Sequence, residues 1–338
     1  MYSTDGVGYF IFLARVARER LQYDLALNIL SYVKSLNPNI RPLQLELIET
    51  KEDMLLHAYP IDKEAVATLV DDYDAYLKQN KKKATYVNRR KAYLYMKYLQ
   101  EPKEAIGLYK RALRKQMSLY DEMDCKLNLA EAYLFNQEPW ESALLYAQVE
   151  REANHPFQKD LAKLGFVQSA FYEGDYELAH ENIKILRTAF DKDIANDALY
   201  LSNLIALFVL PEVMKEHLYL FGQAQLATRS HNFSKAQDFY QKLLDKPMVI
   251  NTARRIHVLL AEIYYLMGQF DTALGVLDTV LNDPDRQQDD ALYLKAKIYD
   301  IALKETEKAK SLYLRLLKEC KDSVFVPEAR KRLEQLGS

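Results

Sequence analysis

The sequence predicts an all-α protein, a right-handed solenoid of about eight helix pairs that ends in a C-terminal capping helix. Three observations lead to this fold class. The 338 residues include only 9 Gly and 10 Pro, too few for the many turns of an all-β fold. One spacing of small and large apolar residues recurs at intervals of 36 and 37 residues. The composition, 49% hydrophobic and 28% charged, is that of a folded protein with a large core.

The recurring spacing is clearest around Ala273, in the stretch "YYLMGQFDTALGVL". Tyr264 lies nine residues before Ala273, and Gly268 stands between them, where a turn between two helices is expected. Ala236 and Ala309 carry similar flanking residues. Small residues let two helix axes approach closely, and larger residues three or four positions away fill the gap to the next pair. The spacing is therefore interpreted as the packing pattern of paired helices.

The same template fits the N-terminal part of the chain. Its centres are Ala26, Ala105, Ala143 with one extra residue, Ala179, and a weaker copy at Ala65. The 57 residues between Ala179 and Ala236 are too many for one repeat, so we expect an apolar helix ending near Pro211 and a long helix from about Glu212. Pro327 is expected in the first turn of the polar capping helix.

These features divide one continuous solenoid into four stretches. We expect N-terminal repeats at 1–122, central repeats at 123–193, an irregular helical joint at 194–216, and C-terminal repeats with the capping helix at 217–338.

This pattern resembles the tetratricopeptide repeat, a pair of antiparallel helices about 34 residues long. The resemblance implies that a protein or peptide partner binds the concave face, which the first helices of the pairs form. The positions that face inward in the repeat fall here on Arg90, Lys97, Tyr98, Phe135, Gln168, Phe171, Tyr172, Gln225, Arg229, Tyr265 and Tyr293. The alternative, expected for about half of them, is packing against neighbouring first helices.

One subtype of the repeat does not fit. Co-chaperone repeats that bind a C-terminal carboxylate use Lys and Asn at two inward positions of the first helix. The corresponding residues are Ile11 and Arg15 in the first repeat, and Phe221 and Gln225 in a later one.

Charge is unevenly distributed along the chain. Residues 81–115 hold 12 Lys or Arg and 2 Glu, whereas residues 46–74 hold 9 acidic and 2 basic residues. In "NKKKATYVNRRKAYLYMKYLQEPKEAIGLYKRALRKQ", basic residues interleaved with Tyr could follow a phosphate backbone and stack bases. Alternatively, Tyr93, Met96 and Tyr109 belong to the core and the basic residues are solvated, or the charges attract an acidic protein or an anionic membrane.

No motif indicates chemistry. Cys125 and Cys320 share no metal-binding spacing, and we expect neither a disulfide nor a zinc site. The six His residues do not pair at metal-ligand spacing. We therefore predict no catalytic residue, no metal, no cofactor and no enzymatic activity.

Residues 126–336 carry a more specific resemblance, in "WESALLYAQVE", "GDYELAHENIKILRTA", "DIANDALYLSNLI" and "DSVFVPEARKRL". They are similar to tetratricopeptide proteins common in Bacteroidetes-type bacteria. The resemblance implies a scaffold or assembly factor of a cell-envelope or secretion complex, periplasmic or outer-membrane-associated, with a possible lipid anchor upstream of Met1. No transmembrane segment is predicted, because the longest apolar run, Leu199–Pro211, is too short. The alternative is a cytoplasmic repeat protein that binds nucleic acid, or another anionic partner, through residues 81–115.

Overall fold

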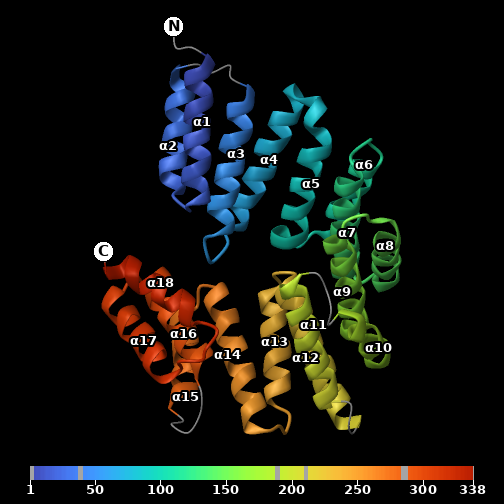
Figure 1. The fold of residues 1–338 in the computed structure, drawn as a ribbon, viewed down its shortest axis with the longest axis vertical. Helices are drawn as coiled ribbons and strands as arrows, with labels where there is room; N and C mark the ends of the chain where they lie inside the picture. The colour runs from blue at the N-terminus through green and yellow to red at the C-terminus, as the bar shows by residue number, and fades with distance from the viewer. Residues whose placement is uncertain (1–3, 37–40, 187–190, 209–211, 283–287, 338) are drawn as a thin grey trace. The chain divides into compact units, whose positions relative to one another are not determined.

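The computed structural model describes residues 4–36, 41–186, 191–208, 212–282 and 288–337 (Figure 1). Within these ranges the chain forms 18 α-helices and no strand, which confirms the all-α prediction. The first ten helices are α1 (Thr4–Glu19), α2 (Tyr23–Leu36), α3 (Arg41–Leu56), α4 (Lys63–Gln79), α5 (Ala84–Leu94), α6 (Pro102–Leu113), α7 (Leu119–Phe135), α8 (Pro139–Glu152), α9 (Pro156–Glu173) and α10 (Tyr176–Leu186). The others are α11 (Lys192–Phe208), α12 (Glu212–Arg229), α13 (Phe233–Leu244), α14 (Ile250–Leu266), α15 (Phe270–Leu281), α16 (Asp289–Lys297), α17 (Thr306–Glu319) and α18 (Val326–Gly337).

The helices form two compact units. The first unit comprises Met1–Gly222 with Arg229–His231, and the second comprises Gln223–Thr228 with Asn232–Ser338. The boundary lies within α12, which begins at Glu212 as predicted. The predicted end of the preceding helix near Pro211 lies outside the described residues.

Most helices belong to pairs joined by a short connection. The first unit contains α1/α2, α3/α4, α5/α6, α7/α8 and α9/α10, the second contains α14/α15 and α16/α17, and a connection of the same kind leads from α12 to α13. Seven of these connections hold one residue in the left-handed backbone region, with φ between 54° and 85°: Leu21, Gln100, Gln137, Gly174, His231, Gly268 and Lys304. The predicted turn at Gly268 is confirmed, but five of the seven positions carry a side chain.

Leu21→Gly is expected to raise the free energy of unfolding. A left-handed conformation costs a residue with a Cβ about 1–2 kcal/mol, and Gly removes this cost from the folded state. Gly also raises the conformational entropy of the unfolded chain, which offsets about 0.5–1 kcal/mol of the gain. Leu21 is 61% exposed, so little packing is lost, and a net gain of about 0.5–1 kcal/mol is expected in urea denaturation. Leu25→Gly, at a half-exposed position inside α2, is the control and should cost about 1 kcal/mol. Destabilisation by Leu21→Gly would contradict the turn geometry.

The second helix of each pair starts three residues before a buried residue, whose N–H bonds the carbonyl just before the helix. The backbone N–H of Ala273 donates to the carbonyl of Gln269 over 3.0 Å, and Ala26 and Ala236 make the equivalent bond. Six of the predicted centres are fully buried: Ala26, Ala105, Ala179, Ala236, Ala273 and Ala309. The small residue at this position therefore lies where the two helices pack, as the sequence spacing predicted.

The predicted register is wrong by one residue at two pairs. Ser142, not Ala143, is fully buried, and its N–H donates to the carbonyl of Glu138 over 3.2 Å. Val66, not Ala65, occupies the same position in α4. Ser and Val replace the expected Ala there, so the neighbouring Ala misled the alignment.

Extra residues occur elsewhere and form π-helical turns. The segments η2 (Tyr95–Leu99) and η3 (Ile298–Ala302) follow α5 and α16. A π-turn holds one more residue than an α-turn, so each takes up an insertion without shifting the helix that follows. This accounts for the inserted residue predicted before Ala309.

Ala273→Leu is expected to destabilise the protein by about 1–3 kcal/mol, because Ala273 is fully buried and the extra methylenes must displace packed neighbours. The measurement is the denaturation midpoint in urea. Ala143→Leu is the matched control: Ala143 is only partly buried, so its substitution should change stability by less than about 0.5 kcal/mol. Equal effects of the two substitutions would contradict the corrected register.

Candidate interaction surface of the first unit

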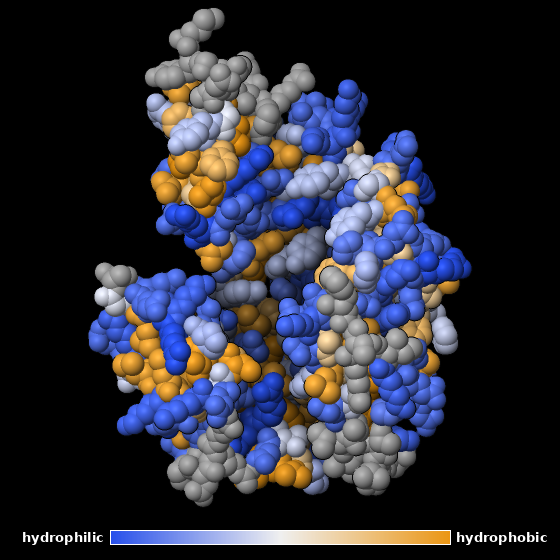
Figure 2. Space-filling model, in the orientation of Figure 1, coloured by the Kyte–Doolittle hydropathy of each residue, from blue (hydrophilic) through white to orange (hydrophobic). Residues whose placement is uncertain are grey.

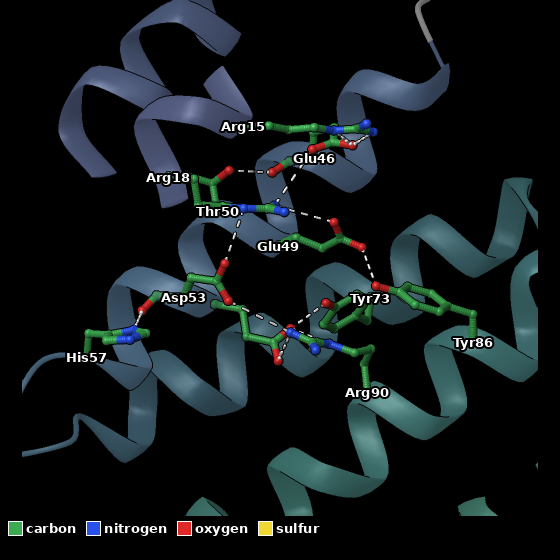
Figure 3. A network of polar contacts seen from close by, with 11 residues as sticks. Arg15, Arg18, Glu46, Glu49, Thr50, Asp53, His57, Tyr73, Tyr86 and Arg90 are labelled. Carbon is green, nitrogen blue, oxygen red and sulfur yellow. Dashed lines mark hydrogen bonds and ion pairs between the residues drawn. The ribbon is translucent and has the colours of Figure 1, made fainter. Parts of the chain in front are cut away.

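The first helices α1, α3 and α5 carry a network of charged side chains, shown in Figure 3. Glu46, Glu49 and Asp53 lie on one face of α3, because residues three and four apart are neighbours on a helix. From α1, Arg15 donates to Glu46 over 2.9 Å, and Arg18 lies 3.4 Å from Glu49 and 3.2 Å from Asp53. The acidic stretch recognised in the sequence thus lies opposite the arginines of the preceding first helix.

Glu52 is the most buried member of this network. Its side chain is 0% exposed, and Arg90 of α5 reaches it with an Nη2–Oε1 distance of 2.7 Å. The hydroxyl of Tyr73 donates to the same carboxylate. Burial raises the pKa of Glu52, and the charge of Arg90 opposes this shift. The guanidinium of Arg90 is therefore already paired with a carboxylate within the protein.

Tyr86 lies at the edge of the network, next to solvent. Its hydroxyl donates to Glu49 over 2.5 Å, and its side chain is 39% exposed. Burial and this hydrogen bond raise the pKa of Tyr86 above its ordinary value. The side chain thus keeps a fixed orientation while part of its ring stays accessible to a partner.

The basic stretch does not form one free patch. Its cations on α5 and η2 have acidic partners: Arg89 pairs with Asp121 and Asp124, Lys91 with Asp74, and Lys97 with Glu131. The interpretation that Arg89, Arg90 and Lys97 are solvated is therefore wrong. Met96 and Tyr109 are buried and Tyr93 packs against them, as the core interpretation predicted.

Several predicted residues meet at Glu131 of α7. Lys97 Nζ lies 3.0 Å and Arg229 Nε 2.7 Å from its carboxylate. Arg229 also donates to Gln168, and Lys97 Nζ lies 4.7 Å from the centre of the Phe135 ring. Burial by itself raises the pKa of Glu131, but the charges of Arg229 and Lys97 outweigh it and lower the pKa to about 2.

Sequence reasoning missed Glu131, although a signal was present. Glu131 follows the small residue Ala130, just as Gln225, which was predicted, follows Ala224. The inward register therefore pointed to Glu131 as well. The acidic residues of α3 were seen only as a charged segment, and their helical spacing would have placed them on one face.

Four predicted residues are buried, which corrects the expectation that they face a partner: Tyr98, Phe171, Tyr172 and Tyr265. Aromatic rings of this size fill the space between helices, which is the packing alternative. Gln225 is partly buried and donates to the hydroxyl of Tyr240 over 2.5 Å. Tyr293 stacks on Phe325 with ring centres 4.6 Å apart.

The described residues contain no group of three or more His, Cys, Asp or Glu placed to hold a metal ion. Cys125 and Cys320 are free and buried, and burial raises the pKa of Cys125 to about 12, where the thiolate nucleophile is scarce. Among the described helices, none combines the length and apolar character that crossing a bilayer requires.

Comparison with known proteins identifies the repeat. Residues 290–323, which include η3 and most of α16 and α17, match the family model of the tetratricopeptide repeat. This segment is therefore a tetratricopeptide-type repeat, in agreement with the spacing seen around Ala309. No curated protein matches the sequence.

Solved structures of repeat proteins are similar along nearly the whole chain. A tetratricopeptide repeat protein from Parabacteroides merdae is 12% identical, covers 99% of this chain and 100% of its own, and has a TM-score of 0.37. The C-terminal part of a repeat protein from Cytophaga hutchinsonii is 11% identical, with 94% and 98% coverage and a TM-score of 0.40. The P58(IPK) TPR domain is 14% identical, with 98% coverage of both chains and a TM-score of 0.31.

Proposed function

We propose that this protein is a non-enzymatic scaffold that binds protein partners through the first helices of its pairs. The observation that carries the proposal is the network on α1, α3 and α5. It holds Arg and Tyr side chains in fixed orientations, and several of them remain partly exposed. Arg and Tyr are enriched in the residues that dominate binding energy at protein interfaces. A side chain that is already ordered also loses less entropy when a partner binds.

The finer proposal is an assembly factor of a bacterial cell-envelope or secretion complex, in the periplasm or at the outer membrane. It is supported by the resemblance of residues 126–336 to exported repeat proteins. Expression of the full reading frame followed by fractionation tests it. Recovery in the cytoplasm alone would contradict the proposed compartment.

The first helices are tested with Tyr86→Ser. Partners captured from native cell extract by the immobilised protein are quantified by mass spectrometry, and the variant is expected to reduce the specific capture about tenfold, as loss of a central interface residue does. Trp140→Ser is the matched control, because Trp140 is 87% exposed but lies on α8, a second helix. Capture that depends on Trp140 and not on Tyr86 would contradict the use of the first helices.

The alternative, nucleic-acid binding through residues 81–115, receives less support. Stacking of bases needs accessible aromatic rings on a basic surface. Tyr98 and Tyr109 are buried, and the cations of α5 are paired with acidic residues. The remaining cations of the stretch are the lysines before α5 and the basic residues on and just after α6.

A further inference from the structure

A pocket of about 680 Å³ lies in the first unit, beside the turn that leads from α4 to α5. The 3₁₀ segment η1 (Lys81–Lys83) and the last turn of α4 form one side of it. Arg15 of α1 and Leu45 and Glu46 of α3 also line it. Its volume is within the range of about 300–1,000 Å³ that is usual for ligand sites.

One wall of the pocket is strongly basic. Lys78 and the three lysines of η1 line it, all four are exposed, and none has an ion pair within the described part of the chain. Figure 2 shows hydrophilic side chains gathered over the ends of α4 and α5, where η1 lies. Four unpaired cations around one pocket make a local positive potential that attracts a negatively charged group.

The rest of the lining is apolar or able to form hydrogen bonds. The partly buried Leu45 supplies apolar surface, and the exposed Gln79 carries an amide that can bond a peptide backbone. Glu46 adds a carboxylate whose charge is already met by Arg15 and Arg18. Such a lining suits a ligand that combines carboxylates, apolar side chains and backbone amides.

We propose that this pocket binds an acidic peptide segment of a partner protein, one that carries Asp or Glu beside an apolar residue. The proposal rests on the scaffold function and adds the place and the chemistry of one contact. The carboxylates lie against Lys78 and η1, and the apolar residue lies against Leu45. Three of the cations come from the segment between two helix pairs, so this site differs from a clamp built on first helices alone.

A nucleic acid fits this pocket less well than a peptide. Tyr76 is the aromatic residue of the pocket lining, and it is buried, so the lining offers no free ring face on which a base could stack. The carboxylate of Glu46 can accept a peptide N–H, a donor that a phosphodiester backbone does not have.

The test uses fluorescence anisotropy with the full chain. The probe is a labelled eight-residue peptide in which Asp and Glu alternate with Leu and Phe, and its controls are the same peptide with Asn and Gln, and a twelve-residue oligothymidylate. The pocket variant is Lys81→Ser/Lys82→Ser/Lys83→Ser. The matched variant Lys103→Ser/Arg111→Ser/Lys115→Ser removes three charges on or just after α6, outside the pocket lining.

We expect the acidic peptide to bind, the pocket variant to weaken it at least tenfold, and the α6 variant to change it less than threefold. The amide peptide should bind at least tenfold more weakly. Equal losses in the two variants would show attraction by net charge only and overturn the proposal. Tighter binding of the oligothymidylate that depends on η1 would replace the peptide by a nucleic acid.

The peptide-binding test and the partner-capture test can fail separately, so the two proposals can be told apart. Suppose that the pocket variant and the unmodified chain capture equal amounts of partner from extract and bind the peptide equally tightly. The pocket proposal then fails and the scaffold proposal stands. If the unmodified chain captures no specific partner but binds the peptide at the pocket, the scaffold proposal fails instead.

Discussion

Arg90→Met is expected to lower the free energy of unfolding by about 3–5 kcal/mol, because it leaves a buried carboxylate without its cation. Glu52 is fully buried, and Arg90 is the cation that lies 2.7 Å from it. Met has a volume similar to that of the Arg stem, so most of the loss reflects the charge. The measurement is equilibrium denaturation in urea at pH 8.

The loss should depend on pH. Burial already raises the pKa of Glu52, and removing Arg90 takes away the charge that opposes this shift. A group whose pKa is raised in the folded state favours folding below its ordinary pKa of 4.5, and this contribution is lost as the pH rises through the folded-state value. The destabilisation should therefore be smaller at pH 5 than at pH 8.

Two further variants separate charge from packing. Arg15→Met removes a cation of the same network whose side chain is 54% exposed, and it should cost less than about 1 kcal/mol. Adding Glu52→Gln to Arg90→Met should recover more than half of the loss, since no buried charge remains. A double variant no more stable than Arg90→Met would show that the loss comes from packing.

Glu131→Gln is expected to lower the free energy of unfolding by about 3 kcal/mol at pH 7. The pKa of Glu131 is about 2 in the folded protein, against an ordinary value of 4.5, and each unit of this difference corresponds to about 1.4 kcal/mol. Gln has the same shape but leaves Lys97 and Arg229 without a counter-charge. Glu122→Gln is the control: Glu122 pairs with Lys126 and is 40% exposed, so its loss should cost about 0.3–0.5 kcal/mol.

The pH dependence again tests the cause. A lowered pKa stabilises the folded state above the ordinary value of 4.5, and this contribution is lost as the pH falls toward 2. The difference between the unmodified protein and Glu131→Gln should therefore narrow over that range. A difference that stays constant down to pH 2 would mean that the carboxylate's charge is not what stabilises the cluster.

The sequence alone determined the helix pairs and the positions where their helices pack. Ala273 and Gly268 could be placed from the sequence because close helix packing admits only small residues, and a left-handed turn favours Gly. Ser142 and Val66 also fit the packing position, so residue type alone placed the register one residue off in those two pairs. Leu21 adopts the left-handed turn conformation although it carries a side chain, so the absence of Gly did not exclude a turn there.

The tertiary structure decided which charged and aromatic residues are accessible. Arg90 meets Glu52 across 38 positions of sequence, and Arg15 meets Glu46 across 31, so each contact joins neighbouring first helices. The repeat period shows that such helices are neighbours, but not which side chains meet, because that depends on the shift and rotation between them. For the same reason the run of basic residues reads as one patch in the sequence, while in the folded chain the cations of α5 are neutralised and the lysines of η1 remain unpaired around a pocket.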